Sequence, residues 1–331
     1  MDKKVSLKIS QLQFVLCTLI VIMHSMNTTY DGLFTSSSDT VFQYLLGGGI
    51  CQIAVPTFYF ISAYLFYWNC DSSEDLKRKI LSRIHTLICP YLIWNTIWEF
   101  YYYLLWKIGY SEKKFIGYKF INFFLDILNS NNTALWFVKW LIVFSLLSPV
   151  IVRLIDNKKV FVVFEIIVTI MILIFKIPYY SILYWTPFYL LGAYIGHSYY
   201  ELFYLIVCLD MKKQAVIILS SILMILSGIF FIMIKWQSYY AILYLRFIGT
   251  LCTLGLLFSL PIFKNDKHYK IFDYTFPIYC MHVPVVGILK HFLRGVIGFI
   301  FIPILVIGSL FYVSAVVKNR MPRLYSVLFG R

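Results

Sequence analysis

Charged side chains are scarce in this sequence. Of its 331 residues, only 13% are Asp, Glu, Lys or Arg, whereas 61% are hydrophobic and 20% are aromatic. A typical water-soluble domain carries about 25% charged residues. A soluble fold of this length could not bury so much apolar surface, so lipid must surround much of the chain. The composition therefore excludes an ordinary soluble protein and indicates an integral membrane protein.

Patterns typical of metal and nucleotide sites are missing too. The seven cysteines include no C-x-x-C pair and no metal-ligand spacing with histidine, so no metal site is expected. The run 47–49 is Gly-Gly-Gly, but it lacks the Lys and Ser/Thr of a phosphate loop and instead predicts close helix packing or a local break. Six cysteines lie in apolar stretches and are interpreted as small buried side chains: Cys17, Cys51, Cys89, Cys208, Cys252 and Cys280.

The N-terminus resembles a signal peptide that lacks a cleavage site. Lys3, Lys4 and Lys8 precede an apolar run over residues 12–23. The sequence that follows, Ser-Met-Asn-Thr at 25–28, is not of the A-x-A type. We therefore expect a retained first membrane helix.

Long apolar runs recur along the whole chain. A helix needs roughly 20 mostly apolar residues to cross the hydrocarbon. This criterion predicts an all-α, polytopic membrane helical bundle of about ten transmembrane helices, with residues 1–331 forming a single domain. The expected spans are 9–27, 42–68, 84–107, 134–152, 160–176, 180–197, 214–235, 239–263, 271–292 and 295–317. The fifth and sixth could instead be one hairpin broken around Pro178, and 117–128 predicts a helix lying in the interface.

The basic residues give the bundle an orientation. With the N-terminus inside, the inner segments hold 19 of the 29 Lys and Arg residues and the outer segments hold 8. The positive-inside rule then predicts two cytoplasmic termini and a multi-pass protein of the inner or plasma membrane. A net charge of +14 would also suit nucleic acid, but these residues cluster between apolar segments, where they orient helices and meet lipid headgroups. No nucleic-acid partner is expected.

A few ionisable residues interrupt the predicted spans. Such a residue costs at least ~2.5–3.5 kcal/mol at mid-span and usually marks function. All but Glu165, which receives no role, fall between mid-depth and the outer surface, and they are the candidate catalytic residues: His24, Glu99, Lys139, Arg246 and His282. Each also has a purely structural interpretation. His24 would pack between helices, Glu99 and Lys139 would form an ion pair, Arg246 would extend to the outer headgroups, and His282 would be held by hydrogen bonds.

His24 carries the sharpest chemical hypothesis. His24 would act either as a base or as a transient acyl carrier. A neutral imidazole is well suited to take a proton from a hydroxyl near neutral pH. A carboxylate such as Glu99 would orient it, and Lys139 or Arg246 would stabilise an oxyanion. Cys17 shares a helix stripe with His24, but a thiol deep in lipid stays protonated and inert.

The densest basic cluster leads into the third span. It consists of Lys77, Arg78, Lys79 and Arg83, on the predicted cytoplasmic side. The cluster is either a topology signal or a grip on the phosphates of a cytosolic donor, for which Arg78 and Arg83 are the candidates.

Seven segments in order resemble the acyltransferase family 3 membrane proteins, which include bacterial polysaccharide O-acetyltransferases. The similar segments are residues 12–25 with His24 near the outer end, 55–64, 83–95, 135–149, 187–192, 276–282 and 321–331. Three positions depart from the family pattern. Gln13 stands eleven residues before His24 where Arg is typical, Ala63 stands where Gly is common, and Lys139 stands where Arg is usual. Arg78 and Lys8 are candidates to supply the charge that Gln13 lacks.

The resemblance implies transfer of an acyl group, usually acetyl, from cytosolic acyl-CoA to a hydroxyl of an extracytoplasmic glycan or glycolipid. It implies acyl-CoA as donor substrate with no bound cofactor, and a glycan or lipid-linked sugar and membrane lipid as partners. Two alternatives stay open. A polysaccharide transporter or flippase would use the same buried charges and often shows internal pseudo-symmetry, which is not found. A glycan polymerase or ligase usually has a large outer loop, whereas the longest here spans about 109–133.

Overall fold

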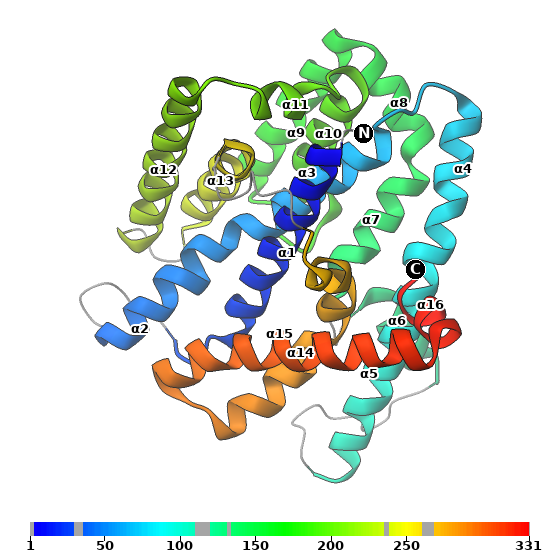
Figure 1. Cartoon of the computed structure of the whole chain (residues 1–331), viewed down its shortest axis with the longest axis vertical. Helices are drawn as coiled ribbons and strands as arrows, with labels where there is room; N and C mark the ends of the chain where they lie inside the picture. The colour runs from blue at the N-terminus through cyan, green and yellow to red at the C-terminus, as the bar shows by residue number, and fades with distance from the viewer. Residues whose placement is uncertain are drawn as a thin grey trace.

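The computed structural model describes residues 3–29, 36–109, 120–130, 134–234, 238–259 and 268–330 (Figure 1). Within these ranges the chain forms helices joined by short connections and contains no β-strand, which confirms the predicted all-α class. The first part of the predicted interfacial segment 117–128 lies outside the described residues, and the rest belongs to a helix.

The helices follow one another closely along the chain. The first half contains α1 (Lys3–Ser25), α2 (Ser38–Gln43), η1 (Tyr44–Gly49), η2 (Ile50–Ile53), α3 (Ala54–Tyr67), α4 (Ser73–Arg83), η3 (Ile84–Ile88), α5 (Cys89–Lys107), α6 (Phe120–Asn129), α7 (Trp136–Leu146) and α8 (Ser148–Asp156). The second half contains α9 (Lys158–Phe175), α10 (Ile182–Ser198), α11 (Leu202–Val207), α12 (Met211–Ile234), α13 (Tyr239–Ser259), η5 (Lys270–Tyr274), α14 (Thr275–Phe292), α15 (Gly295–Arg320) and α16 (Pro322–Phe329).

Within the described residues, each of the ten predicted spans coincides with one of these helices or with a run of consecutive ones, as 42–68 does with α2, η1, η2 and α3. Five helical segments of the described chain are long and apolar enough to cross a membrane: Lys3–Ser25, Ser38–Tyr67, Met211–Ile234, Lys270–Phe292 and Gly295–Arg320. Together with the large apolar surface that they leave exposed, they mark a membrane protein. The count of ten spans stays a prediction.

The predicted span 134–152 is bent in the structure. It is divided into α7 and α8, whose axes differ by 66°. Pro149 lies at the start of α8, where its missing N–H and its ring prevent α7 from continuing. Residues 134–152 are therefore a broken span or a re-entrant segment.

The Gly47–Gly49 run produces the local break that its composition predicted. The chain leaves the α-helical path as the π-helix η1, tightens into the 3-10 helix η2 and resumes as α3. A Cβ atom at Gly47 would overlap the side chain of Met26, so the run also permits close packing. Irregular turns of this kind are frequent at functional sites, and η2 carries Gln52 into one of the cavities described below.

The tightest helix pair joins α3 to α10. Gly192 and Gly196 form a G-x-x-x-G pattern on α10 and face the backbone of α3. A Cβ at Gly192 would overlap the carbonyl oxygen of Phe60, and one at Gly196 would overlap that of Tyr64. Small residues at this spacing let two membrane helices approach closely. The contact fixes α10 against α3, and both helices line the candidate site.

The central position belongs to α1. This helix packs against α3, α14 and α15, and its buried residues belong to the main apolar core. In Figure 1, α12 and α13 pair on one side of the bundle and α4 and α5 lie on the other. The residues of α1 therefore face helices from distant parts of the sequence.

Candidate active site

Two cavities lie along α1, and each is lined by residues from several helices. The first, called the Arg83 cavity, has a volume of about 420 Å³ and is lined by Gln13, Lys79 and Arg83 among others. The second, the His24 cavity, has a volume of about 310 Å³ and is lined by His24, Gln52 and Arg246 among others. Gln13 and His24 are eleven residues apart on one helix, which corresponds to about 16 Å along its axis.

Phe137 and Tyr279 line both cavities. Phe137 comes from α7 and Tyr279 from α14, and their ring centroids are 6.0 Å apart at an interplanar angle of 76°. Both side chains are buried. The two cavities therefore meet at one pair of aromatic rings.

His24 at the end of α1 lies beside His282 of α14. The two ring centroids are 5.1 Å apart. Nδ1 of His282 is 2.7 Å from the backbone oxygen of Tyr279, and since a carbonyl only accepts, Nδ1 carries the proton. Nε2 of neutral His282 is then an acceptor, and it is buried without a hydrogen-bond partner among the described residues. His24 therefore lines the cavity, whereas His282 packs against His24 and does not line it.

Arg246 of α13 is held in the His24 cavity by two side-chain hydrogen bonds. Nη1 donates to the hydroxyl of Tyr184 at 2.7 Å, and Nη2 donates to Oε1 of Gln52 at 2.7 Å. The guanidinium carbon also lies 5.2 Å from the ring centroid of Trp185, within the range of a cation–π contact. Arg246 is thus a fixed positive charge in the cavity that His24 lines, rather than a side chain that reaches outward to headgroups.

Aromatic rings form a large part of the His24 cavity wall. Trp136, Tyr179 and Trp185 all line it. The ring centroids of Trp136 and Trp185 are 5.6 Å apart and those of Trp136 and Tyr179 are 6.1 Å apart. Flat apolar faces with a few fixed polar groups are the usual composition of a small-molecule site.

Only part of the basic cluster on α4 reaches the Arg83 cavity. Lys79 and Arg83 are four residues apart, lie on one face of the helix and both line the cavity. The guanidinium of Arg83 lies 5.2 Å from the ring centroid of Phe66. The side chain of Arg78 is 76% exposed, is paired with Asp75 at 2.6 Å, and is not among the lining residues.

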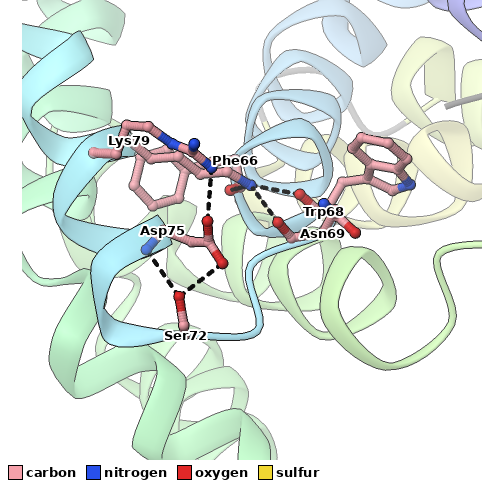
Figure 2. Close-up of polar contacts among 7 residues, drawn as sticks. Phe66, Trp68, Asn69, Ser72, Asp75 and Lys79 are labelled. Carbon is pink, nitrogen blue, oxygen red and sulfur yellow. Dashed lines mark hydrogen bonds and ion pairs between the residues drawn. The ribbon is translucent and has the colours of Figure 1, made fainter.

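Lys79 links α4 to the end of α3 (Figure 2). Its Nζ donates to the carbonyl oxygens of Phe66, Trp68 and Asn69. These oxygens lie at the C-terminal end of α3, where backbone carbonyls have no hydrogen-bond partner within the helix. Burial lowers the pKa of Lys79 from its ordinary value. These contacts use the donors of Lys79 within the protein, so Arg83 is the more available of the two cations for a ligand.

The start of α4 is capped by Ser72, also drawn in Figure 2. Oγ of Ser72 accepts a hydrogen bond from the backbone N–H of Asp75 at 3.1 Å and donates to its carboxylate at 2.8 Å. The hydrogen bond from Ser72 lowers the pKa of the Asp75 carboxyl from its ordinary value. This cap fixes where α4 begins and hence which of its faces carries Arg83 toward the cavity.

Two further candidates lie elsewhere. Glu99 of α5 is 1% exposed, and Lys139 of α7 lies over the ring of Trp140 with Nζ 4.4 Å from its centroid. Neither is among the described residues that line the two cavities. The structure therefore brings together His24, His282 and Arg246 in one place and Arg83 in another, without Glu99 or Lys139 on either wall.

Sequence reasoning missed several uncharged residues of the site. Gln52, Phe137 and Tyr279 line the His24 cavity and Tyr184 accepts a hydrogen bond from Arg246, but a search for intramembrane charges does not select them. The break after the Gly47–Gly49 run was the available signal for Gln52, because irregular backbone within a span commonly lines a cavity.

In the described residues, no group of three or more His, Cys, Asp or Glu side chains could hold a metal ion. A comparison with protein families matched residues 7–318 to the acyltransferase domain of the family 3 type. Neither the curated proteins nor the solved structures gave a significant match. Because the matched region spans nearly the whole chain, the protein belongs to this acyltransferase family and is a membrane acyltransferase.

Proposed function

We propose that the protein moves an acyl group, most simply acetyl, from cytosolic acyl-CoA to a hydroxyl of an extracytoplasmic glycan or glycolipid. In this proposal the chain is one domain that crosses the plasma membrane ten times with both termini in the cytoplasm. The sequence bias of 19 inner against 8 outer basic residues supports that orientation. It assigns the Arg83 cavity to the donor side and the His24 cavity to the acceptor side.

The observation that carries the proposal is the pair of cavities that meet at Phe137 and Tyr279. Arg83 offers a planar cation to the phosphates of a nucleotide thioester, as guanidinium groups suit phosphate oxygens. His24 faces the other cavity, where it can meet an alcohol. A transferase with substrates on opposite sides of a membrane needs this arrangement.

The chemistry follows from the groups in the His24 cavity. His24 takes the proton of the acceptor hydroxyl as its oxygen attacks the thioester carbonyl carbon. Arg246, already fixed by Gln52 and Tyr184, stabilises the oxyanion that forms. The C–S bond then breaks, and the departing thiolate takes the proton from His24 to give free CoA. His282 holds the imidazole of His24 in position.

The acceptor binds against the aromatic wall in this proposal. Trp136 and Trp185 present flat faces to the C–H side of a sugar ring. Rigid aromatic side chains bury large areas with little loss of conformational freedom.

The direct test is the O-acetyl signal of surface glycan, measured by NMR in cells carrying the wild-type protein or His24→Ala. The matched control is His291→Ala, an exposed histidine at the end of α14 that is not among the cavity residues. The signal should disappear in His24→Ala and persist in the control. Equal signals in all three would remove His24 from the mechanism.

The two cavities would also suit a glycan transporter, which binds its substrate without chemistry. Purified protein separates the two functions. A transferase consumes acyl-CoA and releases CoA, whereas a transporter binds glycan and leaves acyl-CoA intact.

A further inference from the structure

We infer that the ring pair Phe137–Tyr279 divides the donor cavity from the acceptor cavity and limits the length of acyl group that the protein transfers. The inference rests on the proposed function. It concerns two residues that do no chemistry themselves but determine which donor can place its carbonyl carbon near His24.

The position of the pair is the first observation. These two side chains line both cavities, and their rings meet nearly edge to face at 6.0 Å between centroids. Tyr279 lies one turn before His282 on α14, and its backbone oxygen accepts a hydrogen bond from Nδ1 of His282. Because the divider is built into the turn that carries His282, an acyl group that reaches His24 must pass the two rings.

The surroundings of the pair are the second observation. Tyr59, itself fully buried, lies with its ring centroid 4.6 Å from that of Phe137 and donates its hydroxyl proton to the backbone oxygen of Phe137 at 3.4 Å. The hydroxyl of Tyr279 donates to the backbone oxygen of Ala134. Phe137 thus packs against a third ring, and the hydroxyl of Tyr279 is held by a hydrogen bond. Neither side chain can change its rotamer without losing these contacts.

A divider of packed aromatic rings discriminates by size. An acetyl group that passes the divider displaces the packed side chains by the size of one methyl group, whereas each further methylene requires a larger displacement. One methylene in such a pocket changes the specificity constant by about 10- to 200-fold. The geometry therefore predicts a strong preference for acetyl over longer acyl groups.

The test measures release of free CoA by the purified, detergent-solubilised protein from acetyl-, butyryl- and hexanoyl-CoA, with water as the hydroxyl that attacks the thioester and the free carboxylic acid as the second product. In wild type, kcat/KM should fall at least about tenfold from acetyl to butyryl. In Phe137→Ala the butyryl-to-acetyl ratio should rise by at least about tenfold, with Phe137→Leu between the two. The Leu variant keeps most of the volume and serves if the Ala variant does not fold.

The matched control is Phe161→Ala. Phe161 is buried, stacks on Tyr194 with ring centroids 4.3 Å apart, and lines neither of the two cavities. The variant removes the same ring away from the divider, so its butyryl-to-acetyl ratio should equal that of wild type. If Phe137→Ala and Phe137→Leu keep the wild-type ratio, or if Phe161→Ala shifts it equally, the inference is wrong. Wild-type protein that releases no CoA would instead overturn the proposed function itself.

Discussion

The rings of His24 and His282 lie 5.1 Å apart at the meeting of α1 and α14. His282 is fully buried and uses its Nδ1 proton on the backbone of its own helix. His282 lines neither of the two cavities, so in the proposed function it acts as a positioning residue rather than as a second base. In that role its ring contact would keep the imidazole of His24 oriented in the cavity.

Replacing His282 by Phe keeps a ring beside His24 but removes Nε2. We expect kcat to fall by at least about tenfold, less than the 10²–10⁴ that loss of a general base costs. The KM for acyl-CoA should not change, since the residue lies away from the Arg83 cavity. The pH profile of kcat should also shift, because the imidazole of His24 would lose its neighbour. A structural role alone would lower the amount of folded protein and leave that profile in place.

Arg246 supplies the positive charge in our account of the oxyanion. Arg246→Gln should lower kcat by about 10²–10³, the usual effect of losing one oxyanion donor. Arg246→Lys should recover only part of the rate, because an ammonium cannot keep the forked contacts with Gln52 and Tyr184. The measurement is CoA release at saturating acyl-CoA. Full activity in Arg246→Gln would contradict this role.

Arg83 is the proposed donor contact, and Gln13 lines the same cavity. Arg83→Gln should raise the KM for acetyl-CoA, because a phosphate loses its cation. Adding Gln13→Arg to that variant should lower the KM again, since it returns a positive charge to the cavity. Arg78→Gln is the control and should bind acetyl-CoA as wild type does, because its side chain is paired with Asp75 outside the cavity. A larger effect of Arg78→Gln than of Arg83→Gln would reverse the assignment.

Lys79 is expected to stabilise the junction of α3 and α4. Lys79→Met leaves the carbonyls of Phe66 and Trp68 without this donor and should cost about 1.5–3 kcal/mol of unfolding free energy. Arg78→Met, one residue away, removes an exposed ion pair and should change it by less than about 1 kcal/mol. Thermal unfolding in detergent compares the two variants. Equal losses would show that the carbonyl contacts of Lys79 contribute little.

The approach of α10 to α3 gives a packing prediction. Gly192→Ala places a Cβ against the carbonyl oxygen of Phe60 and should destabilise the protein by about 1–3 kcal/mol. Gly308→Ala on α15 is the control, because a Cβ there meets no atom within 4 Å, and it should be neutral or slightly stabilising. If both variants unfold at the wild-type temperature, α3 and α10 separate more readily than the structure indicates.

The sequence predicted only part of the group of residues that lie together. Charge and hydropathy placed His24, Arg246 and His282 between mid-depth and the outer surface, and the structure brings these three together. The same reasoning could not tell which way a helix face points, so Glu99 and Lys139 were grouped with them although neither lines the His24 cavity or the Arg83 cavity. On α4, Arg78 was chosen from the sequence together with Arg83, although the helical period places Lys79, and not Arg78, on the same face as Arg83.

Breaks in the backbone were predicted unevenly. The Gly47–Gly49 run was recognised as a possible break because three glycines have little helix propensity. The bend at Pro149 was not predicted, because hydropathy measures how apolar a segment is and carries no information on the direction of the helix axis. The G-x-x-x-G contact of α10 was also missed, although its two glycines are visible in the sequence.

The central claim is that an acyl group travels from a donor on one side of the membrane to an acceptor on the other through the His24 cavity. Incorporation of radiolabelled acetyl-CoA into membrane-bound carbohydrate tests it in sealed vesicles prepared from cells that make the protein. We predict label in inverted vesicles, whose cytoplasmic face is outward, little in right-side-out vesicles, and none above background in inverted vesicles carrying His24→Ala. Equal labelling of both vesicle types, or full labelling with His24→Ala, would contradict the account.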